Sequence, residues 1–420
     1  MPSPELADTS VLPAWFNTSY IQNALRSYLG DDTIKILTYK ASPASAKGDN
    51  YVCILSRIFV EYTSKSHQDT QSGNYILKAT LNGENSDEIK AAFDSYGTYD
   101  HEIEMYDKVS PKIRDVLKKV GYLEDLVPKA VKVDPEHQSI LLEDLNAMGY
   151  KMANVRAGLD EPHAKMVLKK LAKMHAASAF ANSEKPGTFK RCDKGIFNKH
   201  SSAFDKFFNL NLEACARIVS SWEGYETYGE KLFKLLPHFT KYGVRVMEPK
   251  DHHFNVLTHG DLWSNNTMFK YNESNQVVDV ILFDLQFCTW TSPTIDLHYF
   301  FHTSLTDDLR INNTEELVHY YYQNLRDTLQ DLKFTGKIPT LQEFWVEYIE
   351  TAFYAVYSTV SAQPTMINED TEDASLNCLL KDDERSKRLR NAMVNNVRIR
   401  KNLKHFLPVF DRRGLLDIQP

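Results

Sequence analysis

Residues Thr258–Phe269 read THGDLWSNNTMF, and residues Val280–Phe287 read VILFDLQF. A turn at 270–276 joins two short apolar runs, which predicts a small β-hairpin within 256–283. The segments around it, 161–181, 201–236, 314–332, 341–362 and 384–405, have the spacing of helices. This part of the chain is therefore predicted to be mostly helical, with one short β-hairpin packed among the helices.

The N-terminal third has a different pattern. After a helix that ends at Gly30, apolar and polar residues alternate over 34–41, 51–62 and 74–80, then a helix is expected over 88–108 and a β pair at 127–133 and 139–143. The layout predicts an α+β protein with two lobes. Residues 1–145 are expected to form an N-terminal lobe with an antiparallel sheet and a helix, and residues 146–420 are expected to form a larger helical lobe.

The polar residues of the two quoted stretches have a spacing that suits phosphoryl transfer from ATP. That reaction needs a carboxylate that orients an acceptor hydroxyl and takes its proton, and oxygen ligands that hold Mg²⁺ against the phosphates. Asp261 can do the first. Asn266, five residues later, and Asp284, which ends an apolar strand, can do the second. For each aspartate alone a turn or helix cap is the ordinary interpretation, but the combination favours a catalytic site.

A lysine within an apolar strand is the next signal. Lys78 lies in YILKAT, where an unpaired charge would be costly, so it should find an anion. Glu102 or Glu104, on the following helix, can supply a carboxylate, and a phosphate would complete the set. The order of strand lysine, helix glutamate, loop aspartate and strand aspartate favours a nucleotide site over a solvated surface lysine.

The segment at 42–50 joins two predicted strands, where a loop that covers phosphates belongs. It lacks G-x-G-x-x-G and has a single glycine, Gly48. Gly48 and Asn50 are the candidate phosphate contacts, because backbone N–H groups can still surround phosphate oxygens. A solvent-exposed hairpin loop is the alternative.

The segment SILLEDL, at 139–145, is an apolar strand that enters an acidic turn. The backbone at Leu142, Glu143 and Leu145 is the candidate contact for adenine. The same segment also links the two predicted lobes, and the two interpretations are compatible.

Composition narrows the class of protein. A chain of 420 residues is long enough for two lobes, and its net charge of −7 disfavours nucleic acid as a partner. It shows no secretory signal and no uncharged apolar stretch long enough for a membrane span. Five scattered cysteines without C-x-x-C predict free thiols, and hence a cytoplasmic protein. The oligomeric state stays open.

Four segments together carry a family resemblance: HGDLWSNN at 259–266, FDLQ at 283–286, LLEDL at 141–145 and LAKMHAAS at 171–178. They resemble the ecdysteroid kinase-like family, also called CHK kinase-like, which is abundant in insects and related to choline kinases and aminoglycoside phosphotransferases. The resemblance spans roughly residues 15–406. It implies a protein-kinase-like fold with ATP and Mg²⁺ as cofactors.

The resemblance also implies a role for each matching residue. Asp261 matches the catalytic base, and Asn266 and Asp284 match the Mg²⁺ ligands. Lys78 matches the lysine that binds the nucleotide phosphates, and Glu102 matches its partner on the helix.

Two more residues match supporting positions in the family. His259 matches a residue that orients the catalytic loop, and Asp296, in SPTIDLHYF, matches a buried aspartate that braces this loop. Leu285-Gln286 stand where protein kinases have Phe-Gly, which puts protein-kinase activity in doubt. The variable glycine loop of the family reads ASAKGDNY here.

The acceptor is expected to be a small molecule. Only 11 residues separate Asp284 from Asp296, which leaves no room for a segment that docks peptides. Two groups of aromatic residues can wall an apolar acceptor pocket, although core packing is the ordinary interpretation for most of them. They are Phe204, Phe207, Phe208, Trp222, Tyr225, Tyr228 and Phe233, followed by Phe344, Trp345, Tyr348, Phe353, Tyr354 and Tyr357.

The sequence therefore predicts an ATP-dependent kinase that transfers the γ-phosphate to a hydroxyl of an ecdysteroid-like or related small acceptor. One alternative is a kinase for another metabolite, a xenobiotic or a choline-like alcohol, whose cation would need an acidic or aromatic cage. A second alternative is a catalytically silent pseudokinase that binds a lipid or steroid. The presence of Lys78, Asp261, Asn266 and Asp284 disfavours this alternative, and the atypical glycine loop keeps it open.

Overall fold

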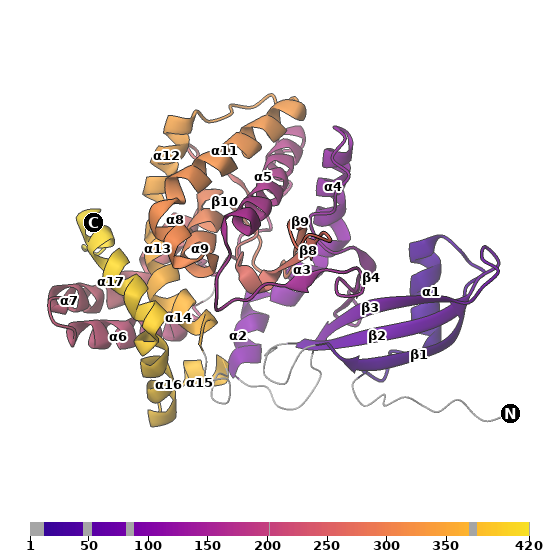
Figure 1. Cartoon of the computed structure of the whole chain (residues 1–420), viewed down its shortest axis with the longest axis horizontal. Coiled ribbons are helices and arrows are strands. Elements are labelled where there is room, and N and C mark those ends of the chain that lie inside the picture. Colours follow the sequence, from indigo (N-terminus) through magenta and orange to yellow (C-terminus); the bar gives the residue numbers. More distant parts are fainter. Residues whose placement is uncertain (1–11, 45–52, 81–87, 201, 369–375, 420) are drawn as a thin grey trace.

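The computed structural model describes residues 12–44, 53–80, 88–200, 202–368 and 376–419. It has the expected α+β architecture with two lobes: a sheet with one covering helix, and a larger helical lobe (Figure 1). The helix and strands of the first lobe are α1 (Thr18–Leu29), β1 (Lys35–Pro43), β2 (Cys53–Thr63), β3 (Gln71–Thr80), β4 (Ala130–Asp134) and β5 (Ser139–Glu143).

The five strands form an antiparallel sheet in the order β1-β2-β3-β5-β4. Side chains alternate between its faces, so Tyr75, Leu77 and Ala79 of β3 are buried in a core that α1 covers. Lys78 belongs to the opposite face. It is paired with Leu55 of β2 and Ile140 of β5, in the middle of the sheet.

The segment between β3 and β4 differs from the single helix expected over 88–108. It consists of α2 (Glu88–Tyr96), α3 (Thr98–Glu104), a π-helical turn (Met105–Val109) and α4 (Ser110–Lys118). The break falls at Gly97, whose φ of 64° is left-handed and costs a glycine little. The helical path then continues ten residues beyond the predicted end, to Lys118.

The second lobe is mostly helical. Its strands are β6 (Lys151–Met152), β7 (Val256–Thr258), β8 (Thr267–Tyr271), β9 (Val277–Leu282) and β10 (Thr289–Thr291). Its helices are α5 (Glu161–Glu184), α6 (Asp205–Ser220), α7 (Glu226–Leu235), α8 (Phe239–Met247), α9 (Thr294–Ser304), α10 (Asp307–Asn312), α11 (Thr314–Asp331), α12 (Leu341–Glu350), α13 (Phe353–Tyr357), α14 (Gln363–Met366), α15 (Leu376–Leu380), α16 (Glu384–Asn395) and α17 (Val397–Arg412). Short 3₁₀ turns lie at Leu236–His238 and Ser264–Asn266, and a π-helical turn lies at Ser358–Ala362.

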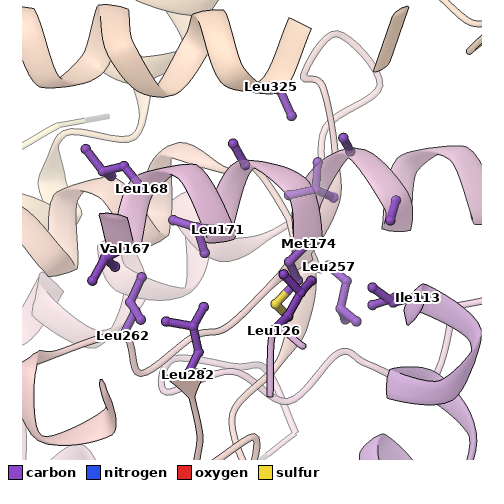
Figure 2. Packing of buried hydrophobic residues seen from close by; sticks show 14 of the residues in the cluster. Ile113, Leu126, Val167, Leu168, Leu171, Met174, Leu257, Leu262, Leu282 and Leu325 are labelled. Atoms are coloured by element: carbon purple, nitrogen blue, oxygen red, sulfur yellow. The ribbon is translucent and has the colours of Figure 1, made fainter. Parts of the chain in front are cut away.

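Helix α5 forms the centre of the larger lobe. It packs along α11 on one side and against β7 and β9 on the other. Figure 2 shows Leu171 and Met174 of α5 beside Leu257 of β7 and Leu282 of β9, in one buried apolar cluster. This core therefore supports β7, which leads into the H-G-D loop, and β9, which leads to Asp284.

Helix α9 was not expected from the sequence. All 11 of its residues are buried, so polar and apolar residues do not alternate between an exposed and a covered face. The periodic signal that reveals a surface helix is therefore missing.

Within the described part of the chain, no helix combines the length and the apolar character needed to cross a bilayer.

Leu171→Ala tests the supporting core. Leu171 is completely buried, and its truncation should lower the free energy of unfolding by about 2–5 kcal/mol, through lost burial and the cavity left behind. Urea denaturation followed by tryptophan fluorescence measures this loss. Lys169→Ala, at an exposed position of the same helix, should change the free energy by no more than ~0.5 kcal/mol. Equal effects of the two changes would contradict this account of the core.

Candidate active site

A mostly buried lysine joins the two lobes through two carboxylates. Lys78 Nζ of β3 lies 2.6 Å from Glu102 Oε2 of α3 and 2.7 Å from Asp284 Oδ1, which follows β9. Burial alone would lower the pKa of Lys78, but the charges of Asp284 and Glu102 outweigh burial and hold that pKa well above its usual value. Lys78 therefore stays charged.

Asp284 has a strained backbone. Its φ of 68° lies in the left-handed region, which costs a non-glycine residue about 1 kcal/mol. Its side chain accepts hydrogen bonds from Lys78 and, at 3.3 Å, from Gln286 Nε2. Strain of this kind persists only where the surroundings hold it, and it gathers at functional sites.

Asp261 lies in the H-G-D loop after β7 and has a hydrogen bond on each carboxylate oxygen. The Tyr299 hydroxyl donates to Oδ1 at 2.7 Å, and Asn266 Nδ2 donates to Oδ2 at 3.1 Å. Burial and the negative charge of Asp284 raise the pKa of Asp261 to about 7, and the two hydrogen bonds oppose that rise. A carboxyl group with this pKa is suited to exchanging a proton near neutral pH.

The amide of Asn266 has a defined orientation. Its Nδ2 also donates to the main-chain oxygen of Asp261 at 2.8 Å, and a carbonyl can only accept, so the amide oxygen must point away from Asp261. The β8–β9 ladder and a hydrogen bond from Phe283 N to Asn266 O, at 3.0 Å, place Asn266 beside the segment that leads from β9 to Asp284. One amide oxygen and one carboxylate at adjacent strand ends form a donor set that suits a hard divalent cation.

The loop that carries Asp261 is braced by a buried aspartate of α9. Asp296 accepts hydrogen bonds from His259 N at 2.7 Å, Gly260 N at 2.9 Å and His175 Nε2 of α5 at 3.1 Å. His259 in turn donates from Nε2 to the main-chain oxygen of Phe283 at 3.0 Å. Burial lowers the pKa of His259, so the neutral ring links the H-G-D loop to the residue before Asp284.

The connection between the lobes is anchored by side chains on its outer side. The Tyr28 hydroxyl of α1 donates to Glu143 Oε1 at 2.6 Å, and Arg57 Nε donates to Asp144 Oδ2 at 2.7 Å. Leu145 joins a small apolar cluster with Tyr150, Met268 and Ile281, and Phe283 packs against it. This small core holds the C-terminal end of the connection against β8 and β9.

The structure brings several of the predicted site residues together. Lys78, Glu102 and Asp284 form one ion cluster, and Asp261 and Asn266 form one hydrogen-bonded pair. Of the two candidate glutamates, it is Glu102 that meets Lys78. Leu142, Glu143 and Leu145 lie at the connection, and Gly48 and Asn50 lie outside the described residues.

Tyr299 is the site residue that the sequence interpretation missed. It follows Asp296 by three positions on α9, so both residues lie on the same helical face. The i, i+3 spacing after the bracing aspartate is a signal that could have indicated it. That signal has meaning only once the segment is recognised as a helix.

The aromatic residues predicted to line an acceptor pocket belong to two different cores in the structure. Phe204, Phe207 and Phe208 share one buried cluster with Tyr354 and Tyr357. Phe344 and Tyr348 belong to the other core, with Trp345 packed against it, and Phe233 is exposed. The cluster around Tyr354 and Tyr357 includes Tyr299, which contacts Asp261, so only part of the predicted set lies close to Asp261.

The fold and the site define a kinase-like phosphotransferase. A sheet lobe holds a lysine–glutamate pair, and a helical lobe supplies the H-G-D loop and the aspartate that completes the ion cluster. The ecdysteroid kinase-like family matches residues 47–334, more than half of the chain, and the chain therefore belongs to that family. It is a phosphotransferase of the small-molecule kinase type, with a hydroxyl group as acceptor.

Solved structures of small-molecule kinases are similar to the chain over most of its length. An ethanolamine kinase of Plasmodium vivax is 13% identical, with 91% of this chain and 89% of that chain covered and a TM-score of 0.36. An amicoumacin kinase is 12% identical, with coverages of 82% and 90% and a TM-score of 0.35. Because these TM-scores are low, the assignment rests on the family match and the site geometry. No curated protein sequence matches the chain significantly.

Gly260→Ala tests the geometry of the H-G-D loop. At φ 79° an added Cβ would lie 2.0 Å from the main-chain oxygen of Phe287, so the loop must move away from Asp296. We expect a loss of about 2–4 kcal/mol in the free energy of unfolding, together with lost phosphotransfer. Gly30→Ala has a similar φ of 67° with open space around the added carbon, and should cost only ~1 kcal/mol and leave phosphotransfer intact. Chemical denaturation and an activity assay measure both effects, and an active Gly260→Ala variant would refute this requirement.

Proposed function

We propose that the protein is an ATP-dependent kinase that uses Mg²⁺ and transfers the γ-phosphate to a hydroxyl of an ecdysteroid-like or related small, largely apolar acceptor. The observation that carries the proposal is the arrangement of Asp261 and Asn266 beside the Lys78–Asp284 ion pair. The arrangement combines a proton acceptor, two oxygen groups for a cation and one fixed positive charge.

Each residue has a role that follows from its chemistry. Asp261 accepts the proton of the acceptor hydroxyl as the oxygen attacks phosphorus. Lys78 binds phosphate oxygens, and Glu102 holds its ammonium group in place. Asn266 and Asp284 hold the cation. When bound, Mg·ATP supplies the γ-phosphoryl group and the positive charge that neutralises the phosphates.

The nucleotide base is proposed to lie at the connection between the lobes. Backbone groups of Leu142, Glu143 and Leu145 would meet adenine, because the side chain of Glu143 is already hydrogen-bonded to Tyr28. The apolar residues next to the connection, including the partly buried Phe283, suit the neighbourhood of a planar base. Backbone groups at Gly48 and Asn50 stay the proposed phosphate contacts.

The acceptor is proposed to be neutral and largely apolar. Tyr299 contacts Asp261, and the rings of Tyr354 and Tyr357 lie 6.0 and 6.3 Å from the Tyr299 ring, between centroids. These buried rings make the surroundings of Asp261 aromatic on this side, which suits an alcohol on an apolar skeleton.

We also propose that the enzyme works in the cytoplasm. All five cysteines are free thiols, and four of them are buried. Free thiols of this kind are typical of a reducing compartment.

A direct assay identifies the acceptor. Purified protein is incubated with Mg·ATP and a panel of ecdysteroids, sterol conjugates, choline, ethanolamine and plant phenolics, and mass spectrometry detects an added phosphate. A phosphorylated ecdysteroid supports the proposal in full, and a product from another class corrects the acceptor. Without ATP binding in a titration that includes Mg²⁺, the chain would be a pseudokinase and the proposal would fail.

Asp261→Asn tests the proton acceptor. The amide cannot take a proton, so turnover of the acceptor should fall by about 10²–10⁴-fold, while Mg·ATP affinity changes little. Coupled ADP release measures turnover, and calorimetry measures nucleotide binding. If ATP affinity collapsed together with turnover, Asp261 would belong to the nucleotide site and the assigned role would be wrong.

Asp284→Ala tests the cation site in a different way. Removing this carboxylate should weaken Mg²⁺-dependent ATP binding by about tenfold or more, equivalent to ~1.4 kcal/mol. Glu273→Ala, at an exposed turn of the same β8–β9 hairpin, is the matched control and should leave binding unchanged. Calorimetric titration of each variant with ATP, with and without Mg²⁺, makes the comparison. Equal affinity in Asp284→Ala and wild type would exclude Asp284 as a cation ligand.

A further inference from the structure

The carboxylate proposed as the proton acceptor has a partner outside the H-G-D motif. The Tyr299 hydroxyl donates a hydrogen bond of 2.7 Å to Asp261 Oδ1, while Asn266 donates to Oδ2. Each carboxylate oxygen can accept more than one hydrogen bond, so an acceptor hydroxyl can still bind. With one donor on each oxygen, the carboxylate cannot rotate without breaking a contact.

The Tyr299 side chain is itself held in place. Its ring is 3% exposed and stacks on Tyr357, with centroids 6.3 Å apart and planes 14° apart. Burial and the charge of Asp261 raise the pKa of Tyr299 well above its usual value, so the phenol keeps its proton. Tyr299 therefore acts as a hydrogen-bond donor and not as a second base.

Helix α9 holds the catalytic loop at two points. Asp296 accepts hydrogen bonds from the main-chain N–H groups of His259 and Gly260, and Tyr299, one turn later, holds the side chain of Asp261. Because both residues are on one face of a buried helix, the loop backbone and the carboxylate share the same rigid support.

We infer that Tyr299 is a positioning residue that fixes the Asp261 carboxylate in the orientation in which it meets the acceptor hydroxyl. The inference rests on the proposed role of Asp261 as the proton acceptor. A displacement of about 1 Å at a reacting group can cost a factor of 10² in rate, so the loss of one of two carboxylate contacts should be visible in kcat.

Tyr299→Phe removes the hydroxyl and keeps the ring. We expect kcat to fall by about 10–100-fold, with KM for ATP and Mg·ATP affinity unchanged. Tyr322→Phe is the matched control: its buried hydroxyl donates to the main-chain oxygen of Pro339 at 2.9 Å, away from Asp261. Both variants lose one buried hydrogen bond and should melt at similar temperatures, but Tyr322→Phe should keep the wild-type kcat. An unchanged or raised kcat in Tyr299→Phe overturns the inference.

Asp261→Asn, measured in parallel, separates the inference from the proposed function. If Asp261→Asn keeps full turnover, the proposed role of Asp261 has failed, and the inference fails with it. If Asp261→Asn is inactive while Tyr299→Phe keeps its kcat, only the inference has failed. The readout is ADP release with Mg·ATP and the acceptor found in the panel, or with water as the acceptor.

Crystal structures give a result that does not depend on turnover. In the wild-type protein the Tyr299 hydroxyl should contact Asp261 Oδ1, and in Tyr299→Phe the carboxylate should rotate while Asn266 stays in place. A wild-type structure without the Tyr299–Asp261 hydrogen bond overturns the inference. An identical position of Asp261 in both proteins overturns it as well.

Discussion

The ion cluster around Lys78 is the interaction on which the rest of the structure depends. A lysine in the centre of a sheet is tolerated only with anionic partners, and its partners here come from two other elements, Glu102 of α3 and Asp284 after β9. The cluster therefore fixes the sheet, the connecting helix and the larger lobe relative to one another. Removing Lys78 would leave two carboxylates close together without a cation between them, at a place that is mostly shielded from water, and this would be costly. The same lysine is the proposed phosphate ligand. One side chain would therefore both hold the lobes together and bind the nucleotide.

In the second lobe, buried hydrogen bonds with α9 hold the H-G-D loop in place, as the ion pairs of Lys78 hold the two lobes together. Its buried aspartate binds two successive main-chain N–H groups of the H-G-D loop, which a flexible loop would otherwise expose to water. A larger residue cannot replace Gly260 without a shift of the backbone, because the main-chain oxygen of Phe287 occupies the space where a Cβ would lie. The position of the loop is thus determined by its contacts with α9 and with the Phe287 backbone, and Asp261 is the next residue of this loop.

Much of the fold and of the site could be predicted from local pattern. Alternation in β3 indicated a strand with Lys78 in it, and the spacing of Asp261, Asn266 and Asp284 indicated a site at two strand ends.

Other features could not be read from the sequence, for physical reasons. A fully buried helix such as α9 has no exposed face and so no periodic signal, which hid Tyr299. The break at Gly97 depends on a left-handed φ that glycine permits but does not require. The choice of Glu102 over Glu104 depends on helix rotation, which tertiary packing sets.

The short distance between Asp284 and Asp296 explains why a small acceptor suits this molecule. The intervening residues form β10, which pairs with β7, and then enter α9 directly, so both ends of the segment are fixed to the catalytic loop. A peptide substrate needs an extended segment beside the catalytic aspartate against which it can lie. Here Tyr299, Tyr354 and Tyr357 pack close together on the α9 and α13 side of Asp261. Aromatic rings with hydroxyl groups can surround an alcohol on a rigid apolar skeleton, but they offer no row of backbone groups for a peptide. The short segment that braces Asp261 therefore agrees with the proposal of a small acceptor and leaves little chain beside Asp261 on which a peptide could dock.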